Sequence, residues 1–176
     1  TYYPAMNSAK DLTQAVETWK DLGLKGEGMV VSIIDSGIDP NHKDMKITDS
    51  SKAKIKKENL KDGPGKYFTE KIPYGYNFAD ENENIIDTHP KVDMHGMHVA
   101  GIVAANGSDE EVAKNEAIKG VAPEAQLLAM KVFSNNPNRQ GAAEDDIVAA
   151  IEESVNQGAD IINMSLGSSA GFQKED

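Results

Sequence analysis

Short apolar runs alternate with amphipathic stretches along the chain, and this alternation predicts strands and helices in turn. Apolar runs rich in β-branched side chains predict buried strands over residues 29–35, 126–133 and 160–165. Apolar positions at helical spacing predict helices over residues 95–105 and 144–157. Because strand and helix alternate, we expect a parallel sheet joined by right-handed crossovers.

Amphipathic spacing also predicts an N-terminal helix and defines the buried face of the last helix. Residues 8–19 carry apolar side chains at helical spacing and begin with a capping pair. In the helix over residues 144–157, the acidic first turn suits the N-terminus, and Gly158 ends the helix. Its buried face is expected to contain Ile147, Val148, Ile151 and Val155.

Residues 36–93 are polar and rich in turn signals, and they interrupt this alternation. We expect a long surface loop there, with short strands only between residues 68 and 78. Glycines at positions 23, 26 and 28 come before the first strand, whereas a dinucleotide-binding loop needs them after it. The dinucleotide-binding interpretation is therefore excluded.

Composition narrows the function further. The 176-residue chain has a formal net charge of −11, which argues against nucleic acid as a partner. It contains no cysteine, so disulfides, thiolate catalysis and cysteine-type zinc sites are excluded. No apolar run is long enough to insert into a membrane. Since residues 160–165 begin like a central strand and only eleven residues follow, we expect the N-terminal portion of a larger domain.

The candidate chemistry lies in an aspartate that ends the first strand and a histidine that begins a helix sixty residues later. In open α/β sheets, functional groups gather at the carboxyl edge, where Asp35 is expected. A buried carboxylate can hold the Nδ1 proton of an imidazole and fix its tautomer for proton transfer. Asp35 taken alone could equally be a turn residue that caps Gly37, and His95 favours the catalytic interpretation.

Other chemistries fit these residues less well. His98 follows His95 by three residues, whereas the zinc-protease helix needs a four-residue spacing and a glutamate. We expect a packing or supporting role for His98. A phosphotransfer domain with Asp35 as acceptor needs a second acid two residues later, where this chain has glycine, and it leaves His95 unexplained.

Four segments resemble the blocks of the subtilisin-like serine proteases, in the same order: residues 35–39 (DSGID), 95–101 (HGMHVAG), 120–123 (GVAP) and 163–167 (NMSLG). Met97, where most of that family has threonine, and residues 125–133 (AQLLAMKVF) look most like the lactocepin cell-envelope proteinases. The resemblance implies an α/β fold with a subtilisin-like parallel sheet and flanking helices. It also implies a serine endopeptidase that hydrolyses extended polypeptides.

The resemblance assigns roles to individual residues. Asp35 would orient the imidazole, and His95 would act as general base and then as general acid. Substrate would bind as an added β-strand between two segments, represented by Gly141 on one side and by Ser165, Leu166 and Gly167 on the other. From spacing alone, Ser165 and Gly167 could simply end a strand and turn the chain.

The resemblance places the nucleophilic serine and the oxyanion-hole asparagine beyond residue 176, because no serine in this chain has the family's Gly-Thr-Ser-Met-Ala context. The 176 residues alone are therefore expected to be inactive. Their expected partners are protein or peptide substrates and the remainder of their own catalytic domain. The alternative is a non-catalytic or degenerate protease fragment that acts as a binding module.

Two further expectations depend on the resemblance. No cofactor is needed for the chemistry, but a structural calcium ion is implied, with Asp44 at the position of a family ligand. Residues 106–119, which would complete that site, form a longer loop that matches the family poorly. The family also implies a secreted enzyme that is associated with the cell wall.

Overall fold

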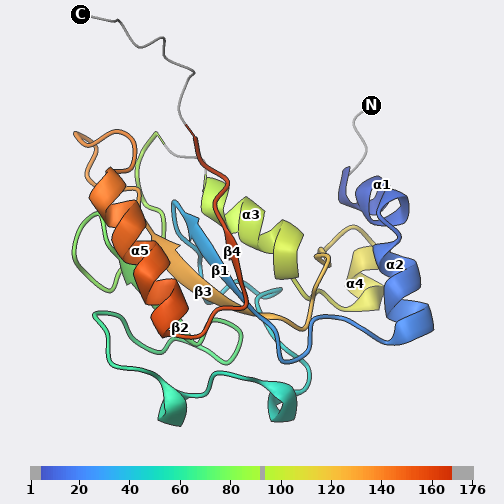
Figure 1. Cartoon of the computed structure of the whole chain (residues 1–176). Coiled ribbons are helices and arrows are strands. Elements are labelled where there is room, and N and C mark those ends of the chain that lie inside the picture. Colours follow the sequence, from blue (N-terminus) through green and yellow to red (C-terminus); the bar gives the residue numbers. More distant parts are fainter. Residues whose placement is uncertain (1–4, 92–93, 168–176) are drawn as a thin grey trace, which may run out of the picture.

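The computed structural model describes residues 5–91 and 94–167, which form a parallel sheet between helices (Figure 1). The strand order is β2-β3-β1-β4. The strands are β1 (Val30–Asp35), β2 (Tyr74–Asn77), β3 (Gln126–Lys131) and β4 (Ile161–Asn163). The α-helices are α1 (Ala5–Leu12), α2 (Ala15–Glu17), α3 (His95–Ala104), α4 (Asp109–Ala113) and α5 (Glu144–Asn156). Short helical turns are Thr18–Leu22, Ser50–Lys52 and Lys57–Asn59. The predicted α/β class and parallel sheet are confirmed.

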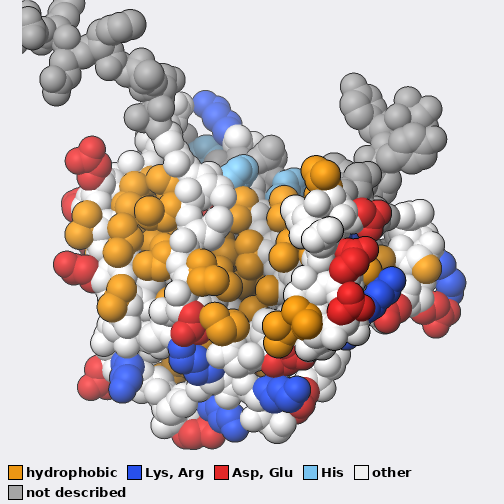
Figure 2. Space-filling model, turned by 45° about the vertical axis from the view of Figure 1, so that its right-hand side comes forward, with side chains coloured by type: hydrophobic (Ala, Val, Ile, Leu, Met, Phe, Trp, Pro, Cys, Tyr) orange, Lys and Arg blue, Asp and Glu red, His pale blue; other side chains and the backbone are white. Residues whose placement is uncertain are grey.

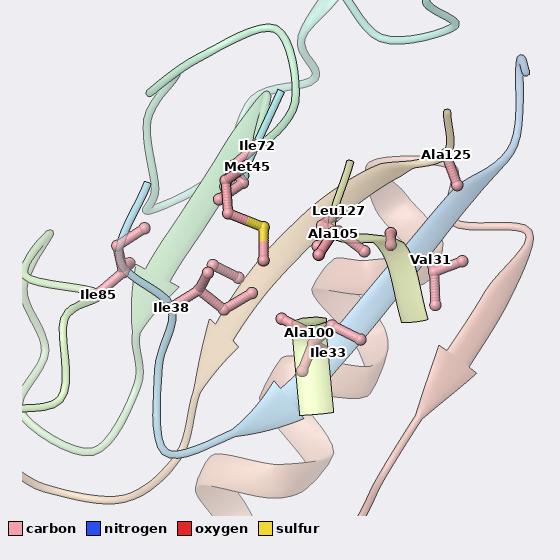
Figure 3. Close-up of a cluster of buried hydrophobic side chains, with 12 residues drawn as sticks. Val31, Ile33, Ile38, Met45, Ile72, Ile85, Ala100, Ala105, Ala125 and Leu127 are labelled. Carbon is pink, nitrogen blue, oxygen red and sulfur yellow. The ribbon is translucent and has the colours of Figure 1, made fainter. Parts of the chain in front are cut away.

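The sheet separates two apolar clusters, because successive side chains of a strand point to opposite faces. Val31 and Ile33 of β1 pack with Ala100 of α3 on one face (Figure 3). Val30 and Ile34 join the cluster on the other face, which α5 covers. Both faces of β1 are therefore buried, as its unbroken apolar run predicts.

The predicted N-terminal helix is interrupted. Gln14 adopts a left-handed conformation with φ of 58°, so α1 ends at Leu12 and a second helical segment begins at Ala15. The backbone N–H of Thr13 still donates to the carbonyl of Ala9 at 3.0 Å, whereas that of Gln14 donates to Asp11, three residues back, at 3.2 Å, so the i→i−4 pattern ends here. The continuous helix predicted over residues 8–19 is therefore wrong at this point.

The buried face of α5 agrees with the expectation only in part: Ile147 and Ile151 pack against the cluster on this side of the sheet as predicted. Ala150 and Ser154 are fully buried, and the Ser154 hydroxyl lies 2.7 Å from the hydroxyl of Ser32 on β1. Val148 and Val155, predicted on that face, are 53% and 66% exposed. Small side chains let α5 approach the sheet closely. The Ser154 hydroxyl donates to the carbonyl of Ala150 at 2.6 Å, so it accepts from the Ser32 hydroxyl. Periodicity of large apolar residues alone does not reveal such a contact.

β4 is shorter than the strand predicted over residues 160–165, lies at the edge of the described sheet and pairs there with β1. Ile161 is 52% exposed there. Figure 2 shows hydrophobic side chains gathered across one face of the molecule. Within residues 5–91 and 94–167, no helix combines the length and apolar character needed to cross a membrane.

Candidate active site

Asp35 is the last residue of β1, and its side chain is held in a fixed position at the carboxyl edge of the sheet. The residue is 1% exposed, and its Oδ1 accepts a 2.6 Å hydrogen bond from the backbone N–H of Ser36. In the strand register, Asp35 lies beside Lys131 of β3. A buried carboxylate in this position needs a further donor to offset its desolvation.

His95 supplies that donor from the first residue of α3. Its Nδ1 lies 2.9 Å from Oδ1 and 3.1 Å from Oδ2 of Asp35. Because the carboxylate accepts at Nδ1, the neutral ring carries its proton there and Nε2 is the basic nitrogen. The His95 side chain is 50% exposed, so one part of the ring reaches the surface while Nδ1 faces a buried anion.

Two glycines bring the start of α3 onto the end of β1. The backbone N–H of Gly96 donates to the Ser36 hydroxyl at 2.9 Å, and a Cβ added at Gly96 would lie 2.6 Å from the carbonyl oxygen of Gly37. Gly37 has φ of +125°, and a Cβ there would lie 2.3 Å from the carbonyl oxygen of Ile85. Neither position has room for a side chain. The close approach of Gly37 and Gly96 therefore sets the distance between the neighbouring residues Asp35 and His95.

Lys131 is a site residue that the sequence did not single out. It is fully buried, and its Nζ donates to the carbonyl of Ser36 at 2.5 Å. Burial lowers the pKa of Lys131, while Asp87, Asp80 and Asp35 act in the opposite direction. The available signal was a lysine between the apolar residues Met130 and Val132, at the end of a buried strand, because a lysine is almost never fully buried unless it is paired.

The two predicted substrate segments follow the strands on either side of β1. Gly141 lies in the segment after β3 and has φ of +75°, and a Cβ added there would have nothing within 4 Å. Ser165 follows β4, is exposed and donates to Oδ1 of Asn163 at 2.9 Å. Leu166 packs against the cluster on the α5 side of the sheet, and Gly167 has nothing within contact distance of an added Cβ.

Of the two roles expected for His98, packing and support of the site, packing does not fit its position. The face of α3 that turns inward carries Gly96, Ala100, Gly101 and Ala104. His98 lies away from that face and is exposed. The two histidines of α3 therefore differ sharply, since only His95 contacts the buried carboxylate.

Asp44, the predicted calcium ligand, is 2% exposed and lies beside the loop over residues 106–119. Its Oδ2 accepts from the backbone N–H of Ile118 at 3.1 Å, and its carbonyl accepts from the N–H of Asn106 at 2.7 Å. Oδ1 is buried and has no hydrogen-bond partner among the described residues. Within the same residues, no group of three or more His, Cys, Asp or Glu side chains could hold a metal ion.

A model of the subtilase family matches residues 26–176, and the chain belongs to that family. It is 47% identical to the PI-type proteinase of Lactococcus lactis subsp. cremoris over 98% of its length, and 34% identical to the C5a peptidase of Streptococcus pyogenes over 88%. The predicted resemblance to the lactocepins is confirmed.

A solved lanthipeptide protease shares the fold, with a TM-score of 0.55 and 21% identity over 91% of this chain and 34% of that one. The curated relatives are much longer than this chain. It spans 9% of the PI-type proteinase and 13% of the C5a peptidase.

Proposed function

We propose that this chain supplies the aspartate and the histidine of a serine endopeptidase that hydrolyses extended polypeptides. The observation that carries the proposal is the contact of His95 Nδ1 with the buried carboxylate of Asp35. This arrangement leaves Nε2 basic and stabilises the imidazolium that forms when the ring accepts a proton. Membership of the subtilase family supports the same chemistry.

The nucleophilic serine and the oxyanion-hole donor would come from sequence that these 176 residues do not contain. Nε2 of His95 would accept the serine proton as the hydroxyl oxygen attacks the peptide carbonyl. The same proton would then pass to the leaving amine as the peptide bond breaks. Asp35 would keep its charge throughout and hold the ring in place. The 176 residues of this chain would thus form the N-terminal portion of the catalytic domain.

The substrate would lie over the end of β1, between the segments that contain Gly141 and Ser165–Gly167. An extended peptide held there would gain backbone hydrogen bonds on both sides. The remainder of the catalytic domain would cover apolar surface around β4 and α5 (Figure 2). That surface includes Val148, Val155, Ile161 and Met164, which are 46–66% exposed.

Two finer proposals accompany this function. A secreted, wall-associated location is supported by the relatives, one of which is the minor extracellular protease Vpr of Bacillus subtilis.

Asp44 would hold a structural calcium ion, supported by its buried, unpartnered Oδ1. Calcium titration of the full-length protein, compared with the variant Asp44→Asn, tests that assignment. Equal affinity in the two proteins would contradict it.

Turnover of an unfolded protein substrate by the full-length protein tests the catalytic assignment. His95→Ala should reduce kcat by about 10⁴-fold or more, because the serine loses its base. His98→Ala, on the same helix, should change kcat less than about threefold because its side chain is exposed. Equal losses in the two folded variants would contradict the assignment. A folded full-length protein without turnover would favour the binding-module alternative.

A further inference from the structure

A pocket of about 310 Å³ lies at the same edge of the sheet as the candidate catalytic pair. Its lining includes His89, Lys91, Phe133, Arg139 and Gly141. Phe133 comes two residues after Lys131, the register neighbour of Asp35, and Gly141 belongs to the proposed substrate segment. A substrate side chain could enter this pocket while the peptide backbone lies over β1.

The two segments that form the pocket are tied together. The backbone N–H of Thr88 donates to Asn135 Oδ1 at 2.9 Å, and Asn135 Nδ2 donates to the carbonyl of Ile86 at 3.0 Å. These bonds join the chain before α3 to the chain after β3. The pocket is therefore held by hydrogen bonds between its walls and is largely formed before a ligand enters.

His89 supplies a buried donor with no acceptor. The residue is 7% exposed, and its Nδ1 accepts a 3.1 Å hydrogen bond from the backbone N–H of Lys91. An imidazole that accepts at Nδ1 carries its proton on Nε2. That Nε2 is buried and has no partner among the described residues. A buried donor left without an acceptor destabilises the site, so a ligand acceptor in the pocket would remove that penalty.

The charge of the pocket points to the kind of acceptor. Lys91 and Arg139 both line it, and its described lining contains no Asp or Glu, although the chain has a net charge of −11. The positive charge of Arg139 is partly neutralised, because its Nη2 lies 3.5 Å from Asp146 Oδ2. Its Nη1 also donates to the carbonyl of Ala79. Lys91 is exposed and is therefore the more available of the two cations.

We propose that this pocket binds an acidic side chain of the polypeptide substrate and makes the enzyme selective for it. A substrate carboxylate would accept the proton of His89 Nε2 in a hydrogen bond and would lie within the field of Lys91. The apolar ring of Phe133 would contact the methylene groups of a glutamate. This proposal rests on the proposed function, because it assumes that a polypeptide lies across this edge of the sheet.

Matched peptide substrates test the proposal with the full-length protein. Each pair of fluorogenic peptides carries Glu or Gln at one position, scanned over four residues on each side of the cleaved bond. At one position, kcat/KM should be about ten- to a hundredfold higher for the Glu peptide, the effect of a charge-assisted hydrogen bond. Equal values within threefold at every position would overturn the proposal.

Substitution of Lys91 separates the pocket from other causes of selectivity. Lys91→Glu should abolish the preference for Glu and favour a peptide with Lys at the same position. Lys46→Glu, a matched change at an exposed lysine outside the pocket, should keep the original preference. A Glu preference that survives in Lys91→Glu would overturn the assignment to this pocket.

Binding distinguishes failure of the pocket from failure of the proposed function. If the wild-type protein cleaves neither an unfolded protein nor any of the peptides, the proposed function fails, and affinities for the same peptides are measured by calorimetry. Tighter binding of one Glu peptide, lost in Lys91→Glu, would still support an acidic ligand for the pocket. Equal affinities for the Glu and Gln peptides would overturn it.

Discussion

Nδ1 of His95 lies 2.9 Å from Oδ1 of Asp35, although the two residues are sixty positions apart in the sequence. The carboxylate is buried at the end of β1, and the ring is half exposed at the start of α3. A contact between these two positions needs the long polar segment between them to return the chain to the same edge of the sheet. The proposed catalysis depends on this one contact.

Replacing Asp35 by Asn should leave substrate binding largely intact and reduce kcat by about 10⁴-fold. An amide can donate to Nδ1, which would move the ring proton to Nε2 and leave no base for the serine. Steady-state kinetics of the full-length protein would separate kcat from KM. A variant that keeps more than one tenth of the wild-type kcat would contradict the role given to Asp35.

Adding a methyl group at Gly96 should push α3 away from β1. The added Cβ would lie 2.6 Å from the backbone oxygen of Gly37, which cannot move as a flexible side chain can. Gly96→Ala should therefore destabilise the protein by about 1–3 kcal/mol and lower kcat as the distance from His95 to Asp35 increases.

Gly101→Ala is the matched control on the same helix. Its Cβ would meet only the side-chain Cδ1 of Ile118, at 3.0 Å, and that atom can shift. Thermal unfolding and kcat should be measured for both variants. Equal effects of Gly96→Ala and Gly101→Ala would show that the contact between Gly96 and Gly37 does not set the geometry of the site.

Lys71 makes stability depend on pH. Burial lowers its pKa from 10.5 to about 7, with a smaller opposing effect from Glu124, and its Nζ donates to the carbonyl of Pro123 at 2.7 Å. Between about pH 7 and pH 10.5, the unfolded chain binds this proton and the folded protein does not. Lys71 therefore makes the free energy of unfolding rise with pH across that window, by a few kcal/mol. Below about pH 7 the buried side chain is charged, and it lowers the stability by this full amount.

The free energy of unfolding, measured from pH 6 to pH 10, would test this dependence. Lys71→Met should flatten the rise of the unfolding free energy with pH, because it removes the buried ammonium. It should also lower stability by about 1 kcal/mol, because the carbonyl of Pro123 loses its hydrogen-bond donor. Lys46→Met, at an exposed lysine, should keep the wild-type slope. Parallel curves for the wild type and Lys71→Met would contradict the pKa assigned to Lys71.

The sequence predicted the sheet, its main helices and the pairing of Asp35 with His95, because these features have local signals. Apolar runs mark strands that are buried on both faces. The glycines that follow Asp35 and His95 in the DSG and HG segments mark a close approach of the two backbones. Four of these segments also follow one another in the same order as in a known family. The predicted strand and helix bounds over residues 29–35, 95–105 and 144–157 agree with β1, α3 and α5 within one residue at each end.

Features that depend on long-range packing were not predictable in this way. The hydroxyl contact between Ser32 and Ser154 decides which face of α5 is buried, and it leaves Val148 and Val155 exposed. The partners of the buried Lys131 come from other segments: its Nζ donates to the carbonyl of Ser36, which follows β1, and the charges of Asp87 and Asp80 oppose the lowering of its pKa by burial. No single segment carries a signal for such contacts.

Fluorophosphonate labelling of the full-length protein, followed by mass-spectrometric mapping of the labelled peptide, tests the central claim most directly. An activated serine outside residues 1–176 should be labelled in the wild type, and the labelling should be lost in His95→Ala and retained in His98→Ala. Labelling that persists in folded His95→Ala, or none in a folded wild type, would contradict a triad completed by Asp35 and His95.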